Sequence, residues 1–172
     1  MKKLLNSTAK KIALCYVLYH ILGIAVYFTT QSYFFLVWNL FLSIVPLFFA
    51  RLLERSLGKR HWSIICVLSL FWLLFYPNAP YMVTDLMHLR WLRFDSADTV
   101  QNILSWIRLL YLALGVLLGG LAGNLSLYKV HRLLSLHWGR WKARFCLAVI
   151  FLLSGYAIYI GRFLRLNSWD IV

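Results

Sequence analysis

Long apolar segments separated by short basic segments constrain the fold of this chain more than any other feature of its sequence. The apolar runs cover residues 12–28, 33–50, 62–76, 103–128 and 145–164. A helix needs about 20 apolar residues to cross a bilayer core, and backbone inside that core must satisfy its own hydrogen bonds. We therefore predict an all-α, polytopic transmembrane helix bundle of about five spans, with residues 1–172 forming a single transmembrane domain.

Composition excludes the main alternatives to a membrane protein. The chain has 172 residues, of which 62% are hydrophobic and 13% charged, and a mean hydropathy of +0.74, so it is too apolar for a soluble domain. The net charge of +13 does not indicate nucleic-acid binding, because the cations lie in patches between apolar runs. Cys15, Cys66 and Cys146 stand singly within or at the end of apolar segments, so we read them as inert thiols.

The position of the basic residues predicts an orientation. The amino-terminal arm, residues 51–61 and residues 129–144 together carry a net charge of +12. Basic loops remain on the cytoplasmic side of a membrane, so we expect a cytoplasmic amino terminus and an extracytoplasmic carboxyl terminus. No small-residue cleavage site follows the first apolar run, which we therefore expect to remain as an anchor.

The third apolar run ends in a polar, proline-containing motif. Residues 62–76 are too few to cross the bilayer alone, and Pro77 and Pro80 follow them. We expect Pro77–Tyr81 to be non-helical and to pack against the ends of the second and fifth spans, because irregular backbone at this depth must be shielded by protein. The charged and apolar mixture over residues 85–94 predicts an interfacial helix.

Two polar motifs emerge on the predicted extracytoplasmic side, one at residues 77–88 and one at residues 161–170. Polar groups beside hydrocarbon are costly, which makes them candidates for function. Asp85 and His88 are the candidate catalytic residues, as a base and its orienting partner. The candidate substrate-binding residues are Asn39, Asn78, Tyr81, Arg162, Arg165, Asn167, Trp169 and Asp170. If helix continues through the fifth span, Tyr159, Arg162, Arg165 and Trp169 share one face.

Several functions fit these residues. The polar groups could only lock two segments together, or the arginines could bind an anionic, lipid-borne substrate. A transporter with Pro77–Tyr81 lining its path is a further alternative. So is an accessory subunit that docks through Gly115, Gly119 and Gly123, a small-residue seam typical of helix contacts. We predict no cofactor and no metal, because the three candidate ligands Asp85, His88 and Asp170 have no supporting residues to orient them. Motifs of the standard soluble-type enzymes are absent.

Three motifs carry a resemblance to a known family. Asn39-x6-Pro46, PNAPY-x-x-TDL-x-H at residues 77–88 and GRFLR-x-NSWD at residues 161–170 resemble the bacterial family called domain of unknown function 1361. The resemblance covers nearly the whole chain and implies a multi-pass protein of the bacterial cell (inner) membrane, without an assigned activity. Members of that family usually continue into a further apolar stretch, which implies that this chain is either naturally short or truncated at Val172.

Overall fold

The computed structural model describes residues 2–30, 33–57, 61–94 and 98–164, and these residues contain no β-strand. The all-α prediction is confirmed. The elements in chain order are α1 (Lys2–Thr30), α2 (Phe34–Leu57), α3 (Trp62–Phe75), α4 (Asn78–Thr84), the 3₁₀ helix η1 (Asp85–Trp91), α5 (Thr99–Trp138), α6 (Arg140–Tyr159) and the π-helical turn η2 (Ile160–Leu164).

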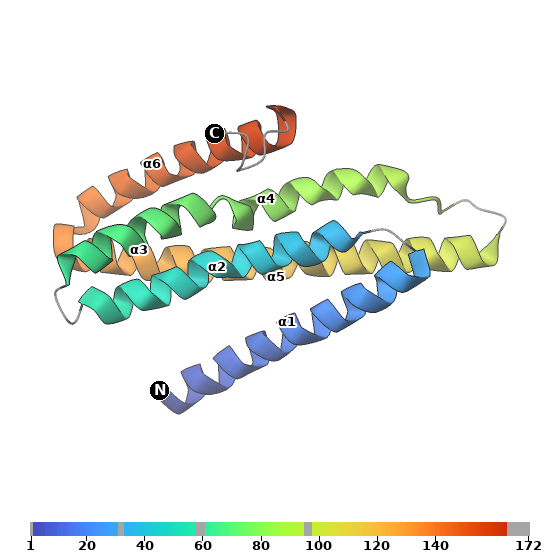
Figure 1. The fold of residues 1–172 in the computed structure, drawn as a ribbon, viewed down its shortest axis with the longest axis horizontal. Helices are drawn as coiled ribbons and strands as arrows, with labels where there is room; N and C mark the ends of the chain where they lie inside the picture. Colours follow the sequence, from blue (N-terminus) through green and yellow to red (C-terminus); the bar gives the residue numbers. More distant parts are fainter. Residues whose placement is uncertain (1, 31–32, 58–60, 95–97, 165–172) are drawn as a thin grey trace.

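Four helical segments are long and apolar enough to cross a membrane. They are Phe34–Leu57, Trp62–Trp91, Thr99–Trp138 and Arg140–Leu164, and a shorter apolar segment, Ala13–Phe28, lies within α1. Their lengths and hydropathy identify a multi-pass integral membrane protein. The third of these segments is composite, because α3, α4 and η1 follow one another in the same direction (Figure 1).

The helices continue beyond the apolar runs, which corrects our placement of the basic residues in loops. Residues 51–57 belong to α2, and residues 129–138 belong to α5. Only Gly139 separates α5 from α6, with a φ of +83° that glycine adopts without strain. Lysine and arginine are good helix formers, so charge alone did not end these helices.

The bundle has two chemically different ends (Figure 1). The amino terminus, the end of α2, the start of α3 and the α5–α6 turn lie at the left of that view. We call this the basic end, and its described cationic side chains are Arg51, Arg55, Lys129, Arg132, Arg140, Lys142 and Arg144. The end of α1, the start of α2 and the start of α5 lie at the right. The predicted cytoplasmic segments thus share one end of the molecule.

The core is formed around α2 and α5, which pack extensively on each other. One apolar cluster includes Leu36, Leu40 and Tyr111, and a second, nearer the basic end, includes Leu53, Trp72 and Val130. The Trp72 indole Nε1 donates a hydrogen bond of 2.7 Å to Ser126 Oγ, which joins α3 to α5 inside the second cluster. Pro46 lies within α2 and is buried.

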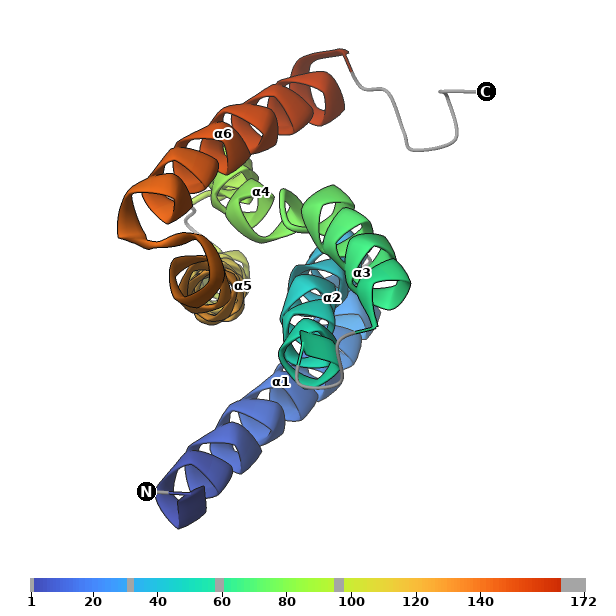
Figure 2. The same cartoon turned by 90° about the vertical axis from the view of Figure 1, so that its left-hand side faces the viewer.

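A pair of tyrosines and a pair of glycines hold α1 against α5. The Tyr19 and Tyr111 rings stack with centroids 4.4 Å apart. A Cβ on Gly115 would meet the Tyr19 hydroxyl, and a Cβ on Gly23 would meet the Tyr111 hydroxyl. The hydroxyl of each tyrosine therefore occupies the space left by the missing side chain of a glycine on the other helix. Away from this contact, the amino-terminal part of α1 diverges from the bundle (Figures 1 and 2).

The glycine seam of α5 is occupied within the molecule, which corrects its assignment as a docking face for a partner protein. A Cβ on Gly119 would lie 2.7 Å from Met82 Cγ, and a Cβ on Gly123 would lie 2.6 Å from Ala79 Cβ. Both contacts belong to α4, so the missing side chains let α4 approach the α5 backbone closely. Gly120, on another face of α5, has nothing within 4 Å of such a Cβ.

The helix break lies at Tyr76–Pro77, and the expectation of a non-helical Pro77–Tyr81 is wrong from Asn78 onwards. Pro80 falls in the first turn of α4, where the missing N–H would have no intrahelical partner in any case. Pro80 has no N–H to donate to the Tyr76 carbonyl. The Ala79 N–H donates to this carbonyl instead, at 3.1 Å. The segment packs mainly on α2 and α5, and only slightly on α6, the expected fifth span.

Candidate functional site

The carboxylate of Asp85 is the centre of a polar site that three separate segments form. Its side chain is only 1% exposed. Arg162 Nη2, from η2, donates to Asp85 Oδ1 at 2.9 Å, and Asn39 Nδ2, from α2, donates to Asp85 Oδ2 at 2.9 Å. Both carboxylate oxygens therefore have a donor, as a buried charge requires. We call Asp85, Asn39, Arg162 and Tyr81 the Asp85 site.

Arg162 has a second contact and unused donors. Its guanidinium carbon lies 4.9 Å from the centroid of the Tyr81 ring, so this contact joins η2 to α4. Its side chain is 18% exposed. Its Nε is buried and has no hydrogen-bond partner among the described residues. An arginine carries five N–H donors, so the single hydrogen bond to Asp85 leaves most of its donors for another acceptor.

Helix geometry brings Arg162 to this site. The α-helical hydrogen bonding of α6 ends at Tyr159, and residues 160–164 form a π-helical turn. A π turn is wider than an α turn, and such turns are frequent at functional sites. The π-helical turn therefore changes the α-helical register between Tyr159 and Arg162, while Arg165 and Trp169, the other two residues of the expected face, lie outside the described residues.

From helical rise, we expect the Asp85 site near the bilayer boundary opposite the basic end. Residues 62–85 rise about 35 Å at 1.5 Å per residue, slightly more than a hydrocarbon core of about 30 Å. Asp85 is the first residue of η1, directly after α4. The α4 helix, held in the glycine seam, thus fixes both the depth and the direction of the carboxylate.

His88 lies next to Asp85 in η1 but does not contact its carboxylate. Its Nδ1 donates to the Asp85 backbone carbonyl at 2.9 Å, and its ring packs 4.5 Å from the Phe35 ring. The arrangement of a base held by an orienting histidine would need a contact between the two side chains. The catalytic roles of Asp85 and His88 remain predictions.

Asn78 has a local structural contact. Its Nδ2 donates to the Phe75 carbonyl at 2.9 Å, in the interval where the proline pair interrupts the helical ladder. The side chain thereby satisfies a carbonyl left free by the break. Four further candidates, Arg165, Asn167, Trp169 and Asp170, lie outside the described residues. Among the described residues, no group of three His, Cys, Asp or Glu side chains could hold a metal ion.

The tyrosine pair that fastens α1 was not recognised from sequence. The hydroxyls of Tyr19 and Tyr111 are buried and have no hydrogen-bond partner among the described residues. Both tyrosines occur in the same short pattern, Tyr19-x3-Gly23 and Tyr111-x3-Gly115. This repeated spacing, one helical turn between an aromatic residue and a glycine, is the signal that could have indicated the contact.

Comparison with known proteins identifies a family but no activity. No curated protein and no solved structure matches the chain. Residues 38–172 match the sequence model of a family described as "Protein of unknown function (DUF1361)", and this match includes α3, α4, η1 and the residues of the Asp85 site. The matched range contains all three motifs, whereas all of α1, including Tyr19, precedes it. The chain belongs to the DUF1361 family.

Proposed function

We propose that the Asp85 site binds the anionic headgroup of a lipid-borne substrate at the extracytoplasmic face of a bacterial cell membrane. The observation that carries this proposal is the state of Arg162, a partly exposed arginine whose buried Nε has no acceptor among the described residues. Arginine matches phosphate and carboxylate groups with two parallel hydrogen bonds. Arg162 is the anion-binding residue, and Arg165 is the second cation of the same motif.

The surrounding residues support binding by holding Arg162 in place. Asp85 accepts from one nitrogen of the guanidinium, and the Tyr81 ring covers its face at 4.9 Å. These two contacts reduce the side-chain freedom that an arginine loses when it binds a ligand. Asp85 acts in this proposal as a fixed counter-charge, because both of its oxygens already accept hydrogen bonds.

A purely structural role is the second candidate, and the burial of Asp85 favours it. The carboxylate is paired on both sides, and the pair joins η1 to η2 across 77 residues of chain. A locked pair of this kind would fasten the end of α6 to the rest of the bundle without any ligand. The two candidates differ in whether Arg162 has a function that lysine cannot supply.

The experiment is the Arg162→Lys variant, assayed by native mass spectrometry with added phosphatidylglycerol. Lysine keeps the charge that pairs with Asp85, but it lacks Nε and the planar fork. We expect the fold to persist while one retained anionic lipid is lost. Arg90→Lys is the matched control, because Arg90 also lies over an aromatic ring, 5.0 Å from the Trp91 centroid, and belongs neither to the Asp85 site nor to the basic end.

The outcomes separate the two candidates. If Arg162→Lys and Arg90→Lys both retain lipid as the unmodified protein does, the binding proposal is wrong and the structural role remains. A diazirine placed next to the lipid headgroup supplies an independent readout, with crosslinks expected on Tyr81 or on residues 160–164. Crosslinks absent from both places would also contradict binding at this site.

A further inference from the structure

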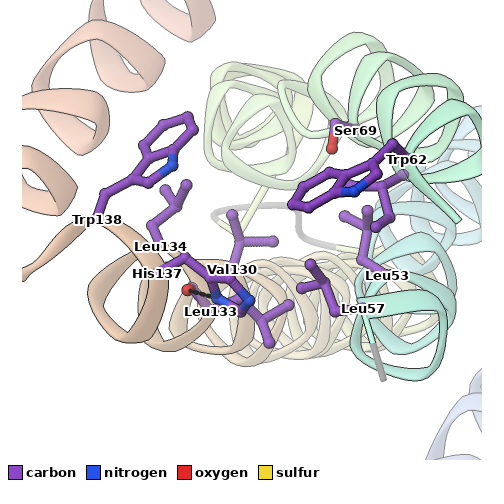
Figure 3. A pocket seen from close by; sticks show the side chains of 10 residues that line it. Leu53, Leu57, Trp62, Ser69, Val130, Leu133, Leu134, His137 and Trp138 are labelled. Atoms are coloured by element: carbon purple, nitrogen blue, oxygen red, sulfur yellow. Dashed lines mark hydrogen bonds between the residues drawn. The ribbon is translucent and has the colours of Figure 1, made fainter. Parts of the chain in front are cut away.

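A groove at the basic end of the bundle has no role in the proposed function. Its volume is about 150 Å³, and it lies between α2, α3 and the last turns of α5 (Figure 3). Its lining residues are Leu53, Leu57, Trp62, Ile65, Ser69, Val130, Leu133, Leu134, His137 and Trp138. The Trp62 and Trp138 side chains lie on opposite sides of the groove in Figure 3.

The lining favours an apolar occupant over water. Eight of its ten residues are apolar, and Ser69 and His137 are the exceptions. His137 Nδ1 already donates to the Leu133 carbonyl at 2.9 Å, so only its other ring nitrogen remains. A bound water needs two to four polar partners, which this lining does not supply, so the groove favours an apolar group.

The tryptophans place the groove at the membrane interface. Trp62 and Trp138 line it, and Trp141, in the first turn of α6, has 81% of its surface exposed. Tryptophans gather at the level of lipid headgroups, where their rings are half in hydrocarbon and half in water. An acyl chain that enters between Trp62 and Trp138 therefore leaves its headgroup at the surface of the basic end.

The charges around this end specify the headgroup. The described basic-end side chains are seven cations, with Glu54 as the single acid among the described residues of these helix ends. Lys129 Nζ contacts Glu54 Oε2 at 2.6 Å, and Arg51, Arg55, Arg132, Arg140, Lys142 and Arg144 are exposed. Among the described residues, no lysine or arginine lines the groove itself, and the cations lie on the helix ends around it. Clusters of lysine and arginine at the cytoplasmic surface attract anionic lipid headgroups.

We infer that this groove is a binding site for one acyl chain of an anionic phospholipid, whose headgroup is held by the surrounding cations. The site is separate from the Asp85 site, because the part of α3 after Ser69 and all of α4 lie between them along the bundle. The occupant is a lipid of the leaflet that faces the basic end. Its role is to hold the ends of α2, α3 and α5 together.

The test fills the groove and leaves the core intact. Ser69 is exposed and lines the groove, so Ser69→Phe adds a ring to the space without removing a buried side chain. Ser63→Phe is the matched control, an exposed serine on the same helix that does not line the groove. In native mass spectrometry with phosphatidylglycerol, we expect Ser69→Phe to lower retention of one lipid about tenfold and Ser63→Phe to leave it unchanged.

The headgroup is tested separately. The unmodified protein should retain phosphatidylglycerol in preference to phosphatidylcholine, and replacing Arg140 and Lys142 by glutamine should reduce this preference about fivefold per charge. Equal retention of the two lipids would overturn the anionic assignment. Equal retention by Ser69→Phe and Ser63→Phe, whether high or low, would overturn the groove as the site.

A crosslinking readout does not depend on any variant folding. Phosphatidylglycerol with a diazirine in its acyl chain should label Leu133, Leu134 or Trp138 in the unmodified protein. Labelling confined to exposed residues that do not line the groove, for example Leu117, would overturn the proposal. The Arg162→Lys variant should keep this labelling, so a failure of the groove and a failure of the Asp85 site are distinguishable.

Discussion

Within the described segments, two ion pairs connect distant parts of the chain, and they differ in what surrounds them. At the Asp85 site, Arg162 contacts Asp85 at 2.9 Å, with side chains 18% and 1% exposed. At the basic end, Lys129 contacts Glu54 at 2.6 Å, with side chains 29% and 39% exposed. The pairs span 77 and 75 residues of sequence. The N···O distances and the sequence separations of the two pairs are similar, and each pair joins a cation to a carboxylate. The exposure of the side chains is therefore the main difference.

Burial changes what the loss of one partner costs. A solvated charge that loses its partner is stabilised by water and salt, so an exposed pair contributes about 0–1 kcal/mol. A buried charge that loses its partner remains without compensation. The shorter contact at the basic end is therefore the weaker one, and a distance alone does not rank the two pairs. The following substitutions test this comparison.

The largest effect is expected for Arg162→Ala. It leaves the buried Asp85 carboxylate with Asn39 as its remaining side-chain donor, and we expect the free energy of unfolding to fall by about 3–5 kcal/mol. Denaturant titration in detergent micelles measures this change. Combining it with Asp85→Leu should restore most of the stability, because the double variant buries no unpaired charge. A double variant as unstable as the single one would contradict this account.

Asn39→Ala removes the other donor to Asp85. Hydrogen bonds to charged groups contribute about 1.5–3 kcal/mol, so we expect a loss of stability in that range by the same titration. Asn124→Ala is the control, since the Asn124 amide is exposed and bonds to the Gly120 carbonyl of its own helix. Similar losses in both variants would show that Asp85 gains nothing from Asn39.

Gly123→Ala tests whether the packing of α4 on the glycine seam of α5 supports the buried Asp85–Arg162 pair. The added Cβ would lie 2.6 Å from Ala79 Cβ, so α4 must shift, at a cost of about 1–3 kcal/mol. Gly120→Ala adds the same atom where nothing lies within 4 Å, and it should leave stability unchanged or raise it slightly. Thermal unfolding followed by circular dichroism compares them, and equal midpoints would rule out the seam as the support.

The smallest effect is expected at the exposed pair. Glu54→Gln removes the charge opposite Lys129 and should change the free energy of unfolding by less than about 1 kcal/mol. High salt should reduce even this difference, since it screens exposed charges. A loss as large as that of Arg162→Ala would break the comparison between the two ends.

The sequence by itself determined the class of fold and the approximate spans. Apolar runs of sufficient length leave helices as the way to satisfy backbone hydrogen bonds in a bilayer, and the structure confirms an all-α bundle. It also located the break after the third run, because a proline cannot continue the hydrogen-bond ladder. Asn39, Asp85 and Arg162 could be grouped in advance because polar side chains at one depth must find one another.

Only the tertiary structure decided how those residues are used. Pro80 falls in the first turn of a new helix because α4 docks on the small residues of α5, a contact that the local sequence does not encode. The same contact places α4 against Gly119 and Gly123, so this glycine seam packs within the molecule and is not available to a partner protein. His88 faces a backbone carbonyl and Phe35, because the 3₁₀ helix sets its direction. Packing between distant segments selects one partner for each polar group, and spacing along the chain cannot make that choice.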